Sequence, residues 1–99
     1  MLDLRTAQKL VEEEVNRSYT WPGDRLVVLE EQTIEKEYGW IFFYTSQRYR
    51  ETGDIRDAVA GNAPIVVDKR TGKLTPLGTA EPVENYLRRY EESLTAEDT

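Results

Sequence analysis

Acidic side chains are the main candidates for chemistry in this chain, because it contains no cysteine and no histidine. Thiolate nucleophiles, disulfides, thiolate zinc sites and imidazole general bases are therefore excluded. Glu35 and Glu37 lie two positions apart, so on a strand their carboxylates would share a face and could act as acid and base. They alternate with Lys36 at a polar strand edge, where glutamates are usually only solvated. We therefore favour no catalytic role for this pair.

Three other patterns match known sites only in part. Asp68 ends an apolar run, but aspartate is favoured at the first position of a turn, which is the simpler interpretation. "DKRTGK" contains a Gly-Lys pair yet is too short for a phosphate-binding loop. "EEEVNR" and "EEQTIEKE" lack the spacing and central glycine of a calcium loop. The sequence predicts a protein with no enzymatic activity, no cofactor and no metal site.

The charge balance bears on the kind of partner. Nineteen acidic residues against thirteen basic ones give a formal net charge of −6. Such a field repels phosphate backbones and anionic lipids and accelerates the approach of a basic protein. We therefore expect a protein partner, with no nucleic acid and no membrane. The alternative is that the charge only maintains solubility.

Two amphipathic helices are predicted at the ends of the chain. The first spans about residues 3–18, with Asp3 as its cap, and "WPGD" at 21–24 ends it with a turn. The second begins at Pro82, and its apolar stripe consists of Val83, Tyr86, Leu87, Tyr90 and Leu94. Residues 95–99 are expected to fray.

Several strands are predicted between the helices: "RLVVLEEQ" (25–32), "GWIFFYTSQ" (39–47), "PIVVD" (64–68) and a strand opening at Leu74. Both faces of the second are apolar, with Trp40, Phe42 and Tyr44 on one and Ile41, Phe43 and Thr45 on the other, which indicates a central strand covered on both sides. "DKRTGKL" is predicted to be a hairpin turn with Gly72 at positive φ. Asp54 is predicted to cap a short helical turn that ends at "GN" (61–62). Residues 1–99 thus form a single α+β domain, a small antiparallel sheet of about five strands with the N- and C-terminal helices packed against it.

A polar segment, "SQRYRETGD" (46–54), is predicted to be irregular and to connect the central strand to the short helix. Long irregular segments in compact domains are often functional. Tyr49 lies between two arginines, a combination typical of binding hot spots. A simple connector is the alternative.

Three blocks of the sequence are similar to a known family. The chain resembles the YrhB-like immunity protein domain, also called immunity protein 35, in the blocks "GWIFFYTSQRYRETGD" (39–54), "AGNAPIVVDKRTG" (60–72) and "GTAEPVENYLRRYE" (78–91). The resemblance extends to the preceding helix sequence "AQKLVEEEVNR" (7–17). The resemblance covers nearly the whole chain. It implies a small α+β fold without enzymatic activity, in a bacterial cytoplasmic protein that neutralises a toxin by direct binding.

The predicted function is therefore that of a non-enzymatic immunity protein, a monomer or weak homodimer that occludes its cognate toxin in the cytoplasm. Two alternatives stay open: a heat-stable, acidic, chaperone-like holdase that binds apolar segments of many clients, and an enzyme that uses Asp68 or a glutamate pair. The predicted contact surface consists of the "SQRYRETGD" segment, the "AGNA" loop (60–63) and the acidic stretches around 12–14 and 30–37. The residues predicted to bind the partner are Arg48, Tyr49, Glu51, Asp54 and Asn62.

Overall fold

Helix α1 (Leu4–Asn16) begins where the sequence predicts it, because Asp3 caps its first turn. The Asp3 carboxylate accepts a hydrogen bond from the Thr6 amide at 2.7 Å, and this bond lowers the pKa of Asp3. Ala7 and Val11 lie on the apolar face of the helix and are fully buried. The computed structural model describes residues 2–54 and 63–97 of the chain.

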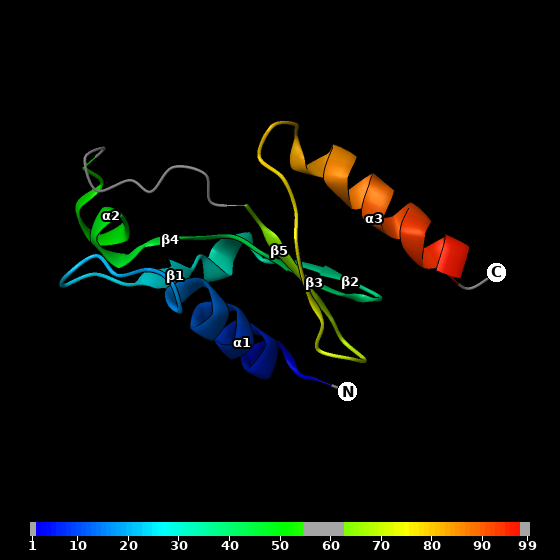
Figure 1. Cartoon of the computed structure of the whole chain (residues 1–99), viewed down its shortest axis with the longest axis horizontal. Helices are drawn as coiled ribbons and strands as arrows, with labels where there is room; N and C mark the ends of the chain where they lie inside the picture. Colours follow the sequence, from blue (N-terminus) through cyan, green and yellow to red (C-terminus); the bar gives the residue numbers. More distant parts are fainter. Residues whose placement is uncertain (1, 55–62, 98–99) are drawn as a thin grey trace.

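The remaining elements follow in chain order, and Figure 1 shows their arrangement. They are β1 (Leu26–Val28), a 3-10 turn (Glu30–Gln32), β2 (Ile34–Lys36), β3 (Gly39–Phe42), β4 (Tyr44–Ser46), α2 (Gln47–Thr52), β5 (Ile65–Asp68), β6 (Leu74–Pro76) and α3 (Val83–Glu97). The predicted helical turn after Asp54 lies outside the described residues.

The strands form two antiparallel sheets. β1 pairs with β4, and the larger sheet has the order β2-β3-β5-β6. The predicted α+β class is confirmed, but the described residues contain six strands in two sheets, where the sequence suggested about five in one. The cause is a change of partner at Phe43, because the chain before it pairs with β5 and the chain after it pairs with β1. At the junction the Phe43 carbonyl accepts a hydrogen bond from the Leu29 amide at 2.7 Å.

Strand β3 is central and buried on both faces, as predicted. Trp40 and Phe42 pack with Ala7 and Val11 of α1, and Ile41 packs on the other side with apolar residues that include Leu87 of α3. All four β3 residues are buried. The two terminal helices therefore cover opposite faces of the larger sheet, as Figure 1 shows.

The polar side of α1 binds the outer edge of β1. Asn16 Oδ1 accepts from the Leu26 amide at 2.7 Å, and Asn16 Nδ2 donates to the Leu26 carbonyl at 2.9 Å. Glu12 Oε2 accepts from the Val28 amide at 3.0 Å. These side chains replace a neighbouring strand, so this edge of the small sheet is closed to a further strand.

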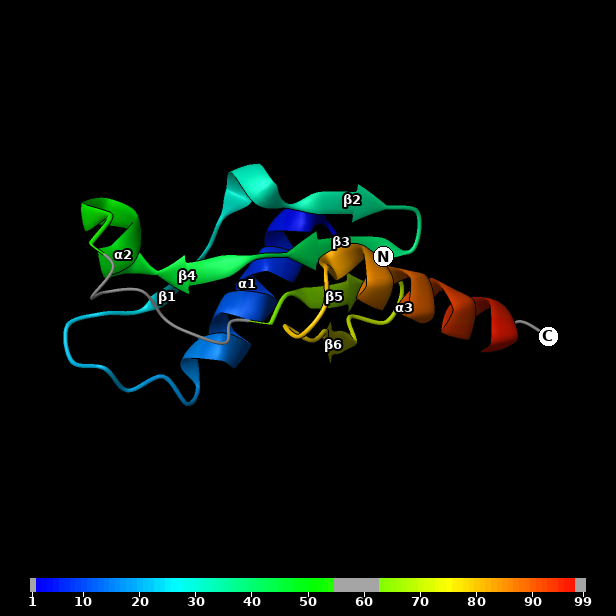
Figure 2. The same cartoon turned by 90° about the horizontal axis from the view of Figure 1, so that it is seen from above.

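Helix α3 starts directly after Pro82 and packs through Leu87, Val83 and Tyr90. The Tyr38 hydroxyl donates to Glu91 Oε2 at 2.8 Å, and partial burial together with this carboxylate raises the pKa of Tyr38. The helix reaches Glu97, so residues 95–97 are helical, and the predicted fraying of the chain end stays a prediction. The described molecule is elongated, with α2 at one end and the end of α3 at the other (Figure 2).

The predicted hairpin between β5 and β6 is confirmed. Gly72 has a φ of 77°, and the Asp68 amide donates to the Lys73 carbonyl at 3.0 Å. Asp68 Oδ1 accepts from the amides of Arg70 and Thr71 at 2.8 and 2.9 Å. Partial burial works against ionisation of Asp68, but these amides lower its pKa overall. Asp68 therefore holds the turn, which is the role that the sequence favoured.

Candidate interaction site

Helix α2 replaces the irregular connector that the sequence suggested for residues 46–54. Ser46 Oγ accepts from the Tyr49 amide at 3.0 Å and caps the start of the helix. Gly53 ends it with a φ of 69° and donates its amide to the Tyr49 carbonyl at 2.8 Å. The prediction of an irregular segment was wrong, because a serine cap and a glycine C-cap delimit a short helix of six residues.

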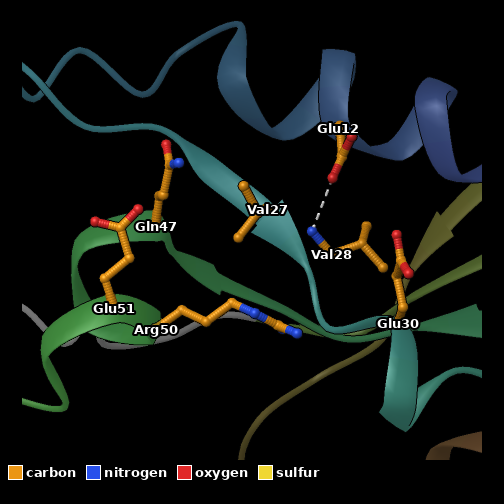
Figure 3. A pocket seen from close by; sticks show the side chains of 7 residues that line it. All are labelled: Glu12, Val27, Val28, Glu30, Gln47, Arg50 and Glu51. Carbon is orange, nitrogen blue, oxygen red and sulfur yellow. Dashed lines mark hydrogen bonds between the residues drawn. The ribbon is translucent and has the colours of Figure 1, made fainter.

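A groove runs between α1 and α2 along β1, with a volume of about 520 Å³. Figure 3 shows the side chains that line it, Glu12, Val27, Val28, Glu30, Gln47, Arg50 and Glu51. They come from four elements that are separated in the sequence. The half-buried Val27 contributes an apolar surface, and the charged residues surround it.

Three carboxylates and one guanidinium line the groove. Arg50 Nη2 forms an ion pair with Glu31 Oε1 at 2.9 Å, and this hydrogen bond lowers the pKa of Glu31. Within residues 2–54 and 63–97, no hydrogen bond or ion pair involves the exposed Glu51 carboxylate. From outside the lining, Glu31 thus balances Arg50, and Arg25 Nη2 lies 3.9 Å from Glu12 Oε1. Because the lining holds three carboxylates against one guanidinium, the groove presents a negative surface.

Asp24 connects the segment before β1 to helix α2. Its carboxylate accepts from the Tyr19 hydroxyl at 2.9 Å, the Arg25 amide at 2.8 Å and the Arg48 amide at 3.1 Å. Desolvation opposes ionisation of Asp24, yet these donors and the Ser46 hydroxyl lower its pKa overall. Asp24 therefore stays ionised at neutral pH and fixes α2 relative to residues 19–25.

The structure brings three of the five predicted partner-binding residues together on α2. Arg48 and Glu51 are exposed and Tyr49 is half-buried, and of the three only Glu51 lines the groove. Asp54 is half-buried beyond the helix end, and its amide donates to Thr52 Oγ1 at 3.1 Å. Asn62 lies outside the described residues.

Sequence reasoning missed several residues at this end of the molecule. Val27 and Arg50 line the groove, and Asp24 fixes its α2 wall. Trp21 was interpreted only as part of a turn, yet its side chain is exposed. Residues 26–28 are a plain apolar run, which does not indicate that Val27 is less buried than its two neighbours, and no local pattern indicates the long-range bond of Asp24.

The residues first considered for catalysis are not arranged for it. Glu35 lies on β2 and forms an ion pair with Lys69 at 3.0 Å, whereas Glu37 lies in the turn that follows β2. The two therefore do not share one strand face. Within the described residues, no group of three or more potential ligand side chains could hold a metal ion. No helix in this part of the chain is long and apolar enough to span a membrane.

Comparison with known proteins tests the family resemblance. The family model described as immunity protein 35 matches residues 5–93. The chain belongs to the immunity protein 35 family. It is also 47% identical, over 53 residues, to the uncharacterized protein YrhB of Escherichia coli strain K12. That match covers 54% of this chain and 56% of YrhB, so the chain spans about half the length of this relative. No solved structure matches.

The family assignment confirms the resemblance and supports an immunity role in general terms. The matched range includes α1 from its second residue on, both sheets and α2, and so covers every residue that lines the groove. The groove therefore lies within the family domain and is not formed by residues outside it.

Proposed function

We propose that this protein is a non-enzymatic immunity protein that binds a cognate toxin in the bacterial cytoplasm and occludes it. Membership of the immunity protein 35 family is the observation that carries the proposal. The family implies a protein partner, and direct binding requires no catalytic group. The chain acts in this proposal as a monomer or a weak homodimer.

The α2 end of the molecule is the proposed contact surface. Glu12, Glu30 and Glu51 surround the apolar surface of Val27, which suits the long apolar stem and charged head of a lysine or arginine side chain. The net charge of −6 also favours fast capture of a basic protein. Arg48 and Tyr49 extend this surface along α2, and Asp54 follows it.

The test of function is co-expression with the C-terminal toxin domain encoded beside the gene for this chain. The wild-type chain should restore growth and should bind the purified domain in the nanomolar range. Binding of many unrelated unfolded proteins, with no preference for that domain, would favour the holdase alternative. Absence of both rescue and binding would remove the immunity proposal.

The contact surface has its own test, Glu51→Arg. Reversing an exposed charge in the groove should slow association with the toxin domain on the order of tenfold at low salt, and less at high salt. The matched control is Glu37→Arg, which makes the same change at an exposed glutamate in the turn after β2. Equal effects of the two variants, measured by stopped-flow fluorescence, would show that only net charge matters and that the groove is not the contact.

A further inference from the structure

Trp21 is the largest exposed apolar side chain in the described part of the chain. Its exposed fraction is 63%, whereas Trp40, the second tryptophan, is 4% exposed in the core. The other large hydrophobic residue exposed among residues 2–54 and 63–97 is Leu4, at 46%. A tryptophan left in water forgoes a large burial energy, and tryptophan is the residue type most enriched in binding hot spots.

The backbone that carries Trp21 is held in a defined turn. Pro22 and Gly23 occupy the two central positions, Gly23 has a φ of 73°, and the Asp24 amide donates to the Trp21 carbonyl at 3.3 Å. This combination is typical of a type II turn, in which glycine supplies the positive φ. Trp21 is therefore presented on an ordered backbone, so little backbone entropy remains to be lost on binding.

The same turn is fixed to the proposed contact surface. The Asp24 carboxylate binds both the Arg48 amide of α2 and the Tyr19 hydroxyl that precedes the turn. Figures 1 and 2 place the segment between α1 and β1 at the same end of the molecule as α2. Trp21 and the negative groove are thus positioned relative to each other before any partner arrives.

We propose that Trp21 is the apolar anchor of this end of the molecule, and that it inserts into an apolar pocket on the toxin. The inference rests on the proposed function and adds the chemistry of the partner, an apolar pocket with basic side chains beside it that face the groove. Arg48 on α2 is exposed, and the side chain of Arg25, next to the turn, is half-exposed. Together with Trp21 and Tyr49 they give this end of the molecule the residue types that are enriched in binding hot spots. A lipid surface fits less well, because three carboxylates in the neighbouring groove repel anionic headgroups.

The test is the affinity of Trp21→Ala for the toxin domain encoded beside the gene for this chain. We expect the dissociation constant to rise on the order of 30-fold or more, mainly through faster dissociation. The matched control is Leu4→Ala, which removes the other exposed large hydrophobic side chain and should leave the constant within about twofold. Both variants should keep the wild-type unfolding midpoint, since neither side chain is in the core.

A second measurement follows Trp21 in the unaltered chain. The chain has two tryptophans, so 5-fluorotryptophan incorporation gives two fluorine resonances, which Trp21→Phe assigns. Addition of the unlabelled toxin domain should shift the Trp21 resonance and remove its sensitivity to solvent deuteration, whereas the Trp40 resonance should barely move.

The outcomes separate the inference from the function. Wild-type binding with an unmoved Trp21 resonance and an unchanged affinity of Trp21→Ala would overturn the inference and leave the immunity role intact. If Trp21→Ala instead abolished self-association in sedimentation velocity, the pocket would belong to a second copy, and the inference would be wrong. Failure of the wild-type chain to bind or rescue would remove the proposed function, and the inference with it.

Discussion

The two sheets differ in how completely they are covered. In the larger sheet, β3 is buried at all four positions, between α1 on one face and apolar residues that include Leu87 of α3 on the other. In the smaller sheet, β1 alternates between buried and half-buried residues, and β4 is half-buried at two of its three positions. The larger sheet thus holds most of the core, and the smaller sheet forms a surface that polar groups surround.

This difference divides the aromatic run of residues 38–49 at Phe43. Trp40 and Phe42, before the division, are core residues, whereas Tyr49, after it, lies half-buried on α2 beside the groove. Core residues tolerate few exchanges because interiors are close-packed. The aromatic residues before Phe43 therefore build mainly the fold, whereas Tyr49 belongs to the contact surface proposed above.

The largest expected effect is on the larger sheet, in Phe42→Ala. Phe42 is fully buried, so its truncation should lower the free energy of unfolding by about 3–5 kcal/mol. Val27→Ala, in the half-buried floor of the groove, should cost about 1 kcal/mol. Urea denaturation followed by circular dichroism measures both, and equal losses would contradict the division between the two sheets.

A smaller effect is expected when a methyl group is added to a glycine in each region. A Cβ at Gly39 would collide with the backbone carbonyl of Val67 on the neighbouring strand, so Gly39→Ala should cost about 3 kcal/mol. Gly53→Ala, at the end of α2, meets no atom within 4 Å and strains only the left-handed backbone, which costs about 1 kcal/mol. The midpoint of thermal unfolding should be lower for Gly39→Ala than for Gly53→Ala. The reverse order would indicate that the α2 end is packed more tightly than the larger sheet.

The smallest expected effect concerns Asp24 and depends on pH. The folded-state pKa of Asp24 is below its unfolded value of 3.8, so its ionised form stabilises the protein fully above that value, and this stability is lost as pH falls through the folded pKa. Asp24→Asn should therefore lower the free energy of unfolding by about 1–2 kcal/mol at about pH 7 and by less at about pH 2. Chemical denaturation at both pH values measures the difference. A loss that is the same at both would show that the charge of Asp24 does not fix the turn to α2.

Much of the fold could be predicted because its signals are local. The periodicity of α1 and α3, the two apolar faces of residues 40–43 and the glycine of the 68–74 turn all reflect neighbours within a few positions. Helix α2 was missed although Ser46 and Gly53 mark its ends, because its polar composition suggested a connector. The chain changes from one sheet to the other at Phe43, yet Trp40, Phe42 and Tyr44 still face the same core cluster. The alternation of side chains therefore continues across the change, and the sequence pattern does not reveal it.

The candidate site shows the same limit more strongly. Arg48, Tyr49 and Glu51 were predicted from their residue types, and the structure places them on one short helix. The groove itself was not predictable, because Glu12, Val27, Glu30 and Glu51 approach one another only after α1 and α2 pack beside β1. The sequence shows that residue 21 is a tryptophan, but it does not show that this side chain is exposed. Exposure depends on whether distant parts of the chain pack over it.

By itself, the amino-acid sequence determined the composition, the absence of thiol and imidazole chemistry, the terminal helices, the doubly apolar central strand and the family. These depend on residue types and short periodicities, which the unfolded chain already contains. Only the tertiary structure decided that the strands divide into two sheets, that an acidic groove forms and that Asp24 joins a turn to a helix 24 residues away. The physical reason is that burial, charge proximity and hydrogen bonding between distant residues come into existence only when packing brings them within contact distance.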